Sequence, residues 1–315
     1  MGDSRPIGLF DSGVGGLTVA REVFRCLPGE AIVYFGDTAR VPYGPRKKEE
    51  LIRFAREIIS FLIAADVKYI IFACGTNSSL TLPFVRGDYA VPMIGLVEPG
   101  AKEAVQATQN GRIGVIATEA TVKSGAYQRV IRSLAPEAEI FAQAAPRLVP
   151  LVEAGRAAGE EARRAVFAYA RPLREAGTDT LILGCTHYPF LAAHFRECLG
   201  PAVRLIDPAA ATVLEARREM EQLGLLNEPA AGNDASAAGG EAGATIAAGD
   251  DAAAAAGAVR HSYYVSGDPA GFIGAARRLG YRLETVRRVL PAGPPPEKEP
   301  KAPRAAGAPS LAGRG

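Results

Sequence analysis

Two cysteines, Cys74 and Cys185, are the residues of this sequence best placed to do chemistry. Each stands at the end of an apolar run typical of a buried strand, residues 69–73 and 180–183, and precedes hydroxyl or amide side chains. Ligands of open parallel sheets bind beyond the carboxyl ends of the strands. A helix beginning there would hold a carboxylate and lower the pKa of a thiol. The alternative, a small hydrophobe in a core, is less favoured because a polar strand end makes a poor core.

The other two cysteines fit packing better than chemistry. Cys198 shares one predicted helical face with Leu191, Phe195 and Leu199, and Cys26 lies at the end of another predicted helix. Four cysteines this far apart do not form a disulfide scaffold, and a cytosolic chain keeps them reduced.

Asp11 and Ser12 lie at the tip of the first predicted strand, before the glycine-rich residues 13–16. This turn lacks the third glycine of a dinucleotide motif and the Gly-Lys-Ser/Thr of a phosphate loop, and the carboxylate would repel phosphate. A substrate ammonium group, or a role as a base near Cys74, suits Asp11 better. A simple helix cap is an equally good alternative for this residue.

His187, two residues after Cys185, is a candidate acid–base partner that would hold the thiol in its working state. The two strand-end cysteines and this histidine could instead bind zinc. Zinc sites usually have a close cysteine pair or an obvious fourth ligand, and the sequence has neither here. We therefore expect no metal.

Pyridoxal phosphate would need a lysine placed to form a Schiff base. Lys47 and Lys48 open a predicted helix, Lys68 precedes its strand, and Lys123 has no motif to support it. We therefore expect no cofactor.

The elements that must position these residues alternate between strand-like apolar runs and helical patterns. This order predicts an α/β fold with mainly parallel sheets flanked by helices. The predicted strands cover residues 7–10, 31–35, 69–73, 113–117 and 180–183, and the predicted helices lie at 17–24, from about 47 onward, and at 127–134.

The two halves of the chain resemble each other. "IGLFDSG" (7–13) and "IGVIATE" (113–119) both open a strand, while "YIIFACGTN" (69–77) and "TLILGCTHY" (180–188) both carry a strand into a cysteine. Two similar domains that face each other across a cleft can present equivalent side chains from opposite directions. The repeat therefore predicts that both thiols reach one site.

Composition excludes several classes of protein. The 315 residues are 48% hydrophobic and 22% charged with a net charge of +2, so no basic footprint suggests nucleic acid. No apolar run approaches a membrane-spanning length and no leader is visible, so we expect a cytoplasmic protein.

Two segments have a composition that does not suit a packed core. Residues 229–257 form an Ala/Gly-rich low-complexity insertion, and residues 291–315 form a Pro-rich tail that is expected to be disordered.

Several motifs occur together and in order: "IGLFDSGVGGLTVAREV", "YFGDTARVPYGPR", "LVEPGA", "TVKSGAY", "LVPLVE", "LILGCTHYP" and, near the end, "YYVSGDPAGF". Together they closely resemble the glutamate racemases of the aspartate/glutamate racemase superfamily, from about residue 7 to 208. The resemblance implies two similar α/β domains with the active site in the cleft between them. One would comprise residues 5–99, 207–228 and 258–290, and the other residues 100–206.

The resemblance also implies roles for individual residues. Cys74 and Cys185 match the catalytic cysteines, and Asp11, Glu153 and His187 match residues that assist them. The matches to substrate-binding residues are Asp11, Ser12, Tyr43, Gly44, Gly75, Thr76, Thr118, Thr121, Thr186 and His187. The family usually has Cys-Asn-Thr at the first cysteine, whereas this chain has Gly75 in the middle and Asn77 two residues later. Gly75 would then offer only its backbone N–H, and Asn77 would have to reach inward.

The activity implied is cofactor-independent interconversion of L- and D-glutamate, which supplies D-glutamate for peptidoglycan. Racemisation removes the Cα proton on one face and returns a proton on the other, and thiols suit both steps. Cys74 would deprotonate D-glutamate, assisted by Asp11, while Cys185, assisted by His187 and Glu153, would protonate the opposite face. The alternatives are a racemase for aspartate or another acidic amino acid, and a regulatory protein that restrains DNA gyrase. The family is commonly dimeric, so a homodimer is expected.

Overall fold

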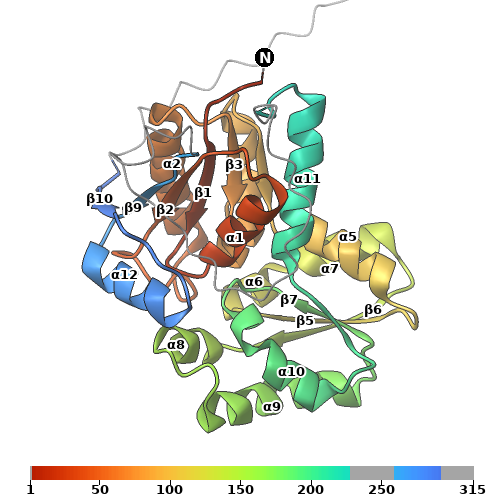
Figure 1. The fold of residues 1–315 in the computed structure, drawn as a ribbon. Coiled ribbons are helices and arrows are strands. Elements are labelled where there is room, and N and C mark those ends of the chain that lie inside the picture. Colours follow the sequence, from red (N-terminus) through yellow and green to blue (C-terminus); the bar gives the residue numbers. More distant parts are fainter. Residues whose placement is uncertain (1, 228–258, 292–315) are drawn as a thin grey trace, which may run out of the picture.

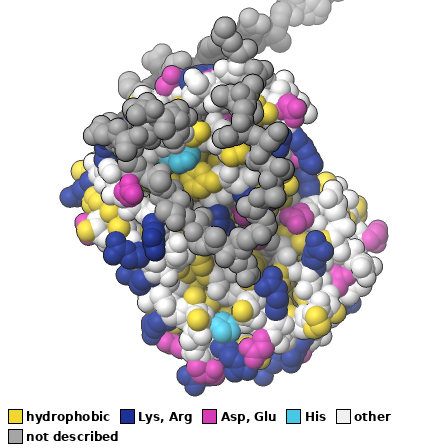
Figure 2. All heavy atoms as spheres, in the orientation of Figure 1, with side chains coloured by type: hydrophobic (Ala, Val, Ile, Leu, Met, Phe, Trp, Pro, Cys, Tyr) yellow, Lys and Arg dark blue, Asp and Glu magenta, His cyan; other side chains and the backbone are white. Residues whose placement is uncertain are grey.

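The computed structural model describes residues 2–227 and 259–291. The predicted insertion 229–257 and the predicted tail from residue 292 onward lie outside the described residues. The described chain builds two parallel sheets, which occupy the upper and lower parts of Figure 1. Among these residues, no helix is both long enough and apolar enough to cross a membrane. Lys/Arg and Asp/Glu side chains are interspersed on the face shown in Figure 2.

The first sheet has the order β10-β9-β2-β1-β3-β4, and every neighbouring pair is parallel. Its strands are β1 (Ile7–Asp11), β2 (Ile32–Gly36), β3 (Tyr69–Phe72), β4 (Met93–Gly95), β9 (Ser262–Val265) and β10 (Arg287–Arg288). The second sheet has the order β6-β5-β7-β8, also all parallel. Its strands are β5 (Arg112–Ala117), β6 (Glu139–Ala144), β7 (Thr180–Leu183) and β8 (Arg204–Ile206).

Helices cover both faces of each sheet (Figure 1). In chain order they are α1 (Leu17–Cys26), α2 (Lys48–Ala64), α3 (Gly75–Leu80), α4 (Leu82–Val85), α5 (Val97–Ala107), α6 (Glu119–Ser124), α7 (Ala126–Leu134), α8 (Leu148–Glu153), α9 (Glu160–Glu175), α10 (Ala192–Leu199), α11 (Pro208–Gln222) and α12 (Pro269–Arg278). Short 3-10 turns cover Arg86–Asp88 and Tyr188–Leu191. The α/β prediction is confirmed.

Alternate residues of one strand enter two different cores. In β1, Ile7 and Leu9 pack with α1, α11 and α12, whereas Phe10 points to the other face and packs with α2. The second sheet is covered in the same way, by α8, α9 and α10 on one face and by α5 and α7 on the other. Strands covered on both faces need continuous apolar runs, and this accounts for the strand pattern of the sequence.

The two sheets repeat one topology, which confirms the resemblance between the halves of the sequence. In each, the first strand lies between the second and the third, and the fourth follows the third, as β2-β1-β3-β4 and β6-β5-β7-β8. The strands that lead into the cysteines, β3 and β7, are therefore equivalent. Cys74 and Cys185 stand at corresponding points, each two residues beyond its strand.

The expected domain boundary between residues 99 and 100 falls inside α5. The buried Val97, Ala101 and Ala104 of this helix all belong to one core together with β5 and β7 residues. A helix moves as one unit, so a boundary would fit better before Val97. The division of the chain into domains stays a prediction.

Candidate active site

A cavity of about 380 Å³ lies where the carboxyl ends of both sheets meet. Cys74 and Cys185 both line it, and each is buried. With the exception of Thr121, every residue predicted for catalysis or substrate binding also lines it. The rest of the lining consists of the charged Glu119 and of six apolar residues, Val41, Pro42, Pro45, Pro146, Val149 and Pro150. A small polar molecule held there would have a sulfur atom from each sheet beside it.

On the side of the second sheet, three residues form a chain of polar contacts. The Cys185 sulfur lies 3.8 Å from Nδ1 of His187, and Nε2 of the same ring lies 3.2 Å from a Glu153 carboxylate oxygen. Glu153 ends α8, so this helix delivers the carboxylate to the histidine. Burial disfavours the charged imidazole, but its bonds to Cys185 and Glu153 prevail and raise the pKa of His187 to about 10. The ring is therefore cationic at neutral pH.

On the side of the first sheet, Asp11 ends β1 and is almost completely buried. Its carboxylate accepts the backbone N–H of Gly13 at 2.7 Å and the hydroxyl of Thr186 at 3.4 Å. Burial raises the pKa of Asp11 to about 6, although the nearby His187 and the backbone N–H groups of the turn act in the opposite direction. Thr186 lies in the turn after β7 of the other sheet, so this bond joins the two sides of the cavity.

The prediction that a helix start lowers the pKa of the first thiol is wrong for Cys74. Burial raises the pKa of this thiol to about 12, the Asp11 carboxylate acts in the same direction, and the backbone N–H groups of Asn77 and Ser12 offset only part of the effect. Cys74 does precede α3, but desolvation outweighs the favourable N–H groups. Without substrate, Cys74 is thus a neutral thiol, 4.0 Å from the Ser12 hydroxyl.

A row of hydroxyl groups crosses the floor of the cavity. Thr76 and Thr118, one from each half of the chain, lie 3.1 Å apart between their oxygens. Thr118 also lies 3.0 Å from the hydroxyl of Thr121, which is buried and stands behind it, near Ser79. The predicted substrate-binding residue Thr121 therefore supports Thr118 and does not line the cavity.

Gly75 lines the cavity, whereas Asn77 does not. Asn77 is fully buried in α3, where its side-chain oxygen accepts a hydrogen bond from Thr81 at 3.4 Å. The expectation that Asn77 reaches inward in place of the missing asparagine is therefore not met.

Tyr43 and Gly44 line the cavity from the loop between β2 and α2. The buried Asp37 holds this loop, because it accepts hydrogen bonds from the Tyr43 hydroxyl, from Ser266 at 2.7 Å and from Arg40 at 2.8 Å. Neither Asp37 nor Ser266 was predicted from the sequence. Asp37 directly follows β2, and Asp11 ends the neighbouring β1. This shared position at the end of a strand is the feature of the sequence that could have identified Asp37.

We expect Ser266→Ala to lower the free energy of unfolding by about 1–3 kcal/mol, because one oxygen of a buried carboxylate loses its hydroxyl donor. Urea unfolding followed by circular dichroism measures the change. Ser133→Ala is the matched control, since this exposed hydroxyl bonds only a neighbouring carbonyl, and its effect should stay within about 0.5 kcal/mol. Equal losses in the two variants would contradict the anchoring role of Ser266.

The remaining cysteines are packing residues, as predicted. Cys198 is buried in one core with Leu191, Phe195 and Leu199, and Cys26 packs at the edge of the first-sheet core. Within the described parts of the chain, no group of three or more His, Cys, Asp or Glu side chains could hold a metal ion.

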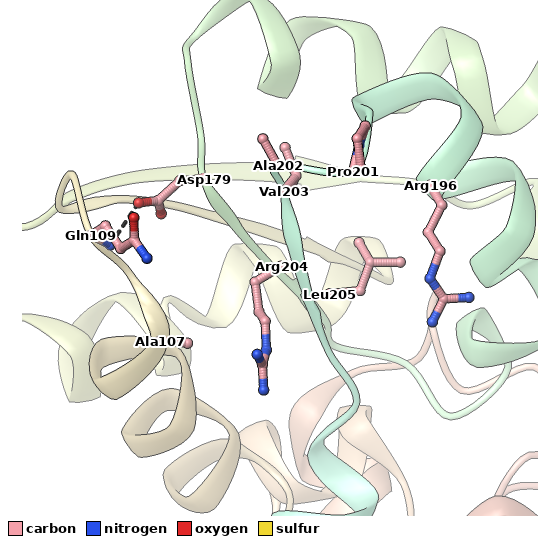
Figure 3. Close-up of a pocket in the computed structure, with 9 residues that line it drawn as sticks. All are labelled: Ala107, Gln109, Asp179, Arg196, Pro201, Ala202, Val203, Arg204 and Leu205. Carbon is pink, nitrogen blue, oxygen red and sulfur yellow. Dashed lines mark hydrogen bonds between the residues drawn. The ribbon is translucent and has the colours of Figure 1, made fainter.

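A second cavity, of about 370 Å³, lies at the opposite end of the four-stranded sheet, before β7 and β8 (Figure 3). Arg196, Arg204 and Asp179 supply its charged groups. Both Asp179 oxygens are occupied, because they accept the Thr108 hydroxyl and the backbone N–H groups of residues 109 and 110. None of the predicted site residues lines it, so the first cavity is the candidate active site.

Comparison with known proteins identifies the family of this chain. Residues 7–216 match the family model described as Asp/Glu/Hydantoin racemase. A glutamate racemase from Desulforudis audaxviator is 58% identical over 218 residues, which are 69% of this chain and 80% of that protein.

Solved structures of glutamate racemases are also similar to this chain. A glutamate racemase from Thermus thermophilus in complex with β-chloro-D-alanine is 41% identical, with a TM-score of 0.76 over 92% of this chain and 98% of that one. A glutamate racemase from Francisella tularensis in complex with D-glutamate is 30% identical, with a TM-score of 0.77 over 91% and 98%. The chain therefore belongs to the Asp/Glu/hydantoin racemase family, and within it resembles the glutamate racemases.

Proposed function

We propose that this protein interconverts L- and D-glutamate by proton transfer at Cα between two cysteines, without a cofactor. The observation that carries this proposal is the pair of thiols, Cys74 and Cys185, which come from equivalent strand ends of two sheets and line one cavity. Two fixed groups on opposite sides of one carbon need only small motions to invert it.

Each inversion conserves protons, and exchange with solvent then returns the active-site groups to their starting protonation states. With D-glutamate, Cys74 gives its thiol proton to the Asp11 carboxylate, and the resulting thiolate takes the Cα proton and becomes a thiol again. The Cys185 thiol gives its proton to the opposite face and becomes a thiolate. The reverse reaction exchanges these roles. Between the two steps, negative charge extends from Cα into the α-carboxylate, where hydrogen-bond donors lower its energy.

The lining of the cavity suits a small acidic amino acid. The hydroxyls of Ser12, Thr76 and Thr118 and the cationic ring of His187 suit carboxylates, while the Asp11 carboxylate suits an ammonium group. The Francisella tularensis relative was solved with D-glutamate, which supports glutamate as the substrate. A panel of D- and L-glutamate and aspartate tests this choice, and turnover of aspartate alone would favour the related activity.

Hydrogen exchange tests the reaction itself. Enzyme freed of metal and of pyridoxal phosphate, incubated with either enantiomer in deuterated water, should place deuterium at Cα of the product, because solvent-exchanged thiols supply that proton. The position is read by proton NMR and mass spectrometry. A product that keeps its original Cα hydrogen would overturn the proposal.

The pH profile of kcat/KM should be bell-shaped. Asp11 assists as a carboxylate, so activity rises with pH up to its pKa of about 6, and His187 assists as a cation, so activity falls above its pKa of about 10. Initial rates between about pH 5 and about pH 10.5, with circular dichroism as a check on folding, measure the profile. An acid limb that persists unchanged in Asp11→Asn would contradict the assignment to this carboxyl.

The wider role follows from the product. We propose that D-glutamate made here supplies peptidoglycan synthesis, that the enzyme acts in the cytoplasm and that it forms a homodimer. A bacterial strain that lacks its own racemase and requires D-glutamate should grow without it when it expresses this chain. A supercoiling assay with DNA gyrase tests the alternative regulatory role, for which the near-neutral net charge of +2 offers no support.

A further inference from the structure

The end of α12 contacts the end of the helix that carries Glu153. Nε and one terminal nitrogen of Arg278, in the last turn of α12, donate hydrogen bonds to the Glu153 backbone carbonyl at 3.3 and 3.2 Å. The aliphatic part of the same side chain lies against the next turn, where a Cβ atom on Gly155 would come within 2.9 Å of it. Figure 1 shows α12 directly above α8, although 125 positions of sequence separate the two bonded residues.

The Glu153 carbonyl is a group that needs such a donor. The last four carbonyl groups of a helix have no N–H partner within that helix, and Glu153 is the last residue of α8. The backbone N–H groups of the three residues that follow it bond instead to the carbonyls of Pro150, Val152 and Leu151. Arg278 therefore supplies the hydrogen bonds that this carbonyl would otherwise lack, as basic side chains can at the C-terminus of a helix.

The position of this main chain matters because little else fixes the Glu153 carboxylate. The side chain is 40% exposed, and within the described residues the bond to Nε2 of His187 at 3.2 Å is its one hydrogen bond. Movement of the α8 end would therefore change the contact between the carboxylate and the ring. The ring in turn lies 3.8 Å from the Cys185 sulfur, so the disturbance would reach this thiol.

A second contact joins the same segment to the turn that follows the histidine. Phe190 lies in the 3-10 turn that begins after His187, and its ring meets the ring of Tyr281 edge-on, with centroids 6.4 Å apart. Leu279, between Arg278 and Tyr281, packs against the cores of both sheets. The segment that ends α12 thus contacts both elements that position the histidine and its glutamate.

We infer that Arg278 is a positioning residue that holds Glu153 in place for the His187–Cys185 side of the reaction. This inference rests on the proposed two-thiol mechanism, in which His187 assists the Cys185 thiol. Arg278 does not line the cavity, so its effect passes through the main chain of α8. Misplacement of a group by 1 Å can cost about 10²-fold in rate, and loss of one support of the glutamate should cost a part of that, roughly 10-fold.

The test compares Arg278→Ala with Arg277→Ala. Arg277 is the neighbouring exposed arginine of α12, and its side chain forms no ion pair or hydrogen bond with any described residue. We expect Arg278→Ala to lower kcat about 10-fold while KM changes by less than about threefold, because the substrate-binding groups stay in place. Arg278→Lys keeps a donor for the carbonyl and should recover part of the rate. Arg277→Ala should keep wild-type kinetics, and all three variants should melt cooperatively.

A double-mutant cycle shows whether Arg278 acts through Glu153. In a Glu153→Gln background, Arg278→Ala should cause less than about a twofold further loss, because the carboxylate that it positions is already gone. The same loss of about 10-fold in both backgrounds would overturn the inference, as would wild-type kcat in Arg278→Ala alone.

Titration of His187 gives a readout that a general loss of active protein would not change. The titratable groups that act on this ring are Cys185, Glu153 and Asp11, and the bond to Glu153 is one cause of its raised pKa. In Arg278→Ala the pKa of His187 should therefore fall toward its ordinary value. NMR of protein labelled at its three histidines measures this change, and an unchanged pKa would overturn the inference. Full activity of the cysteine variants would instead overturn the proposed mechanism, so the two failures are distinguishable.

Discussion

Cys74→Ala and Cys185→Ala should each reduce racemisation in both directions by about 10³-fold or more, because positioned acids and bases contribute up to about 10⁴-fold and each turnover needs one of each. Circular dichroism of the amino acid follows inversion starting from either enantiomer. Cys26→Ala is the matched control, since this partly buried thiol packs at the edge of a core outside the cavity and its loss should leave the rate unchanged.

The two single variants together distinguish one base from two. A single group that serves both faces would make one cysteine dispensable, whereas two thiols on opposite faces are both required whichever enantiomer is supplied. Retention of more than about a tenth of the wild-type rate by either variant would contradict the two-thiol mechanism. Thermal melting shows whether a variant has lost activity only because it is unfolded.

Asp11→Asn and His187→Asn should each lower kcat by about 10²-fold, with opposite preferences for the two enantiomers. Asp11 lies close enough to Cys74 for its charge to raise the pKa of that thiol, and His187 contacts the Cys185 sulfur. Loss of Asp11 should slow removal of the proton from D-glutamate, and loss of His187 should slow its removal from L-glutamate.

Isotope effects measure this difference better than rates do. The equilibrium constant of a racemisation is one, so kcat/KM must be equal in the two directions for every variant. Glutamate deuterated at Cα should give a larger rate effect with the D enantiomer in Asp11→Asn and with the L enantiomer in His187→Asn.

Asp66→Asn provides the control, because this exposed residue has a positive φ of 56° that asparagine tolerates, and it lies outside the cavity. The same isotope preference in both active-site variants would contradict the assignment of the two residues to opposite sides.

Local patterns were enough to predict the architecture of this protein. Strands covered on both faces leave continuous apolar runs, and those ending before Cys74 and Cys185 were visible without coordinates. The repeat of "YIIFACGTN" in "TLILGCTHY" also predicted equivalent positions for the two thiols, and the two sheets share one topology. The motifs supplied nearly the whole lining of the cavity, since they are short segments that follow strands.

Tertiary structure alone decided how those residues are held and charged. Ser266 reaches Asp37 across 229 positions of sequence, and Thr121 stands behind Thr118 because its helix turns it away from the cavity. The pKa of Cys74 rises because the folded chain excludes water from it, and the Gly184 carbonyl from the other half of the chain lies close to Gly75. Periodicity is a property of neighbouring residues, whereas desolvation and close approach are sums over atoms from distant segments, and only the folded chain brings those atoms together.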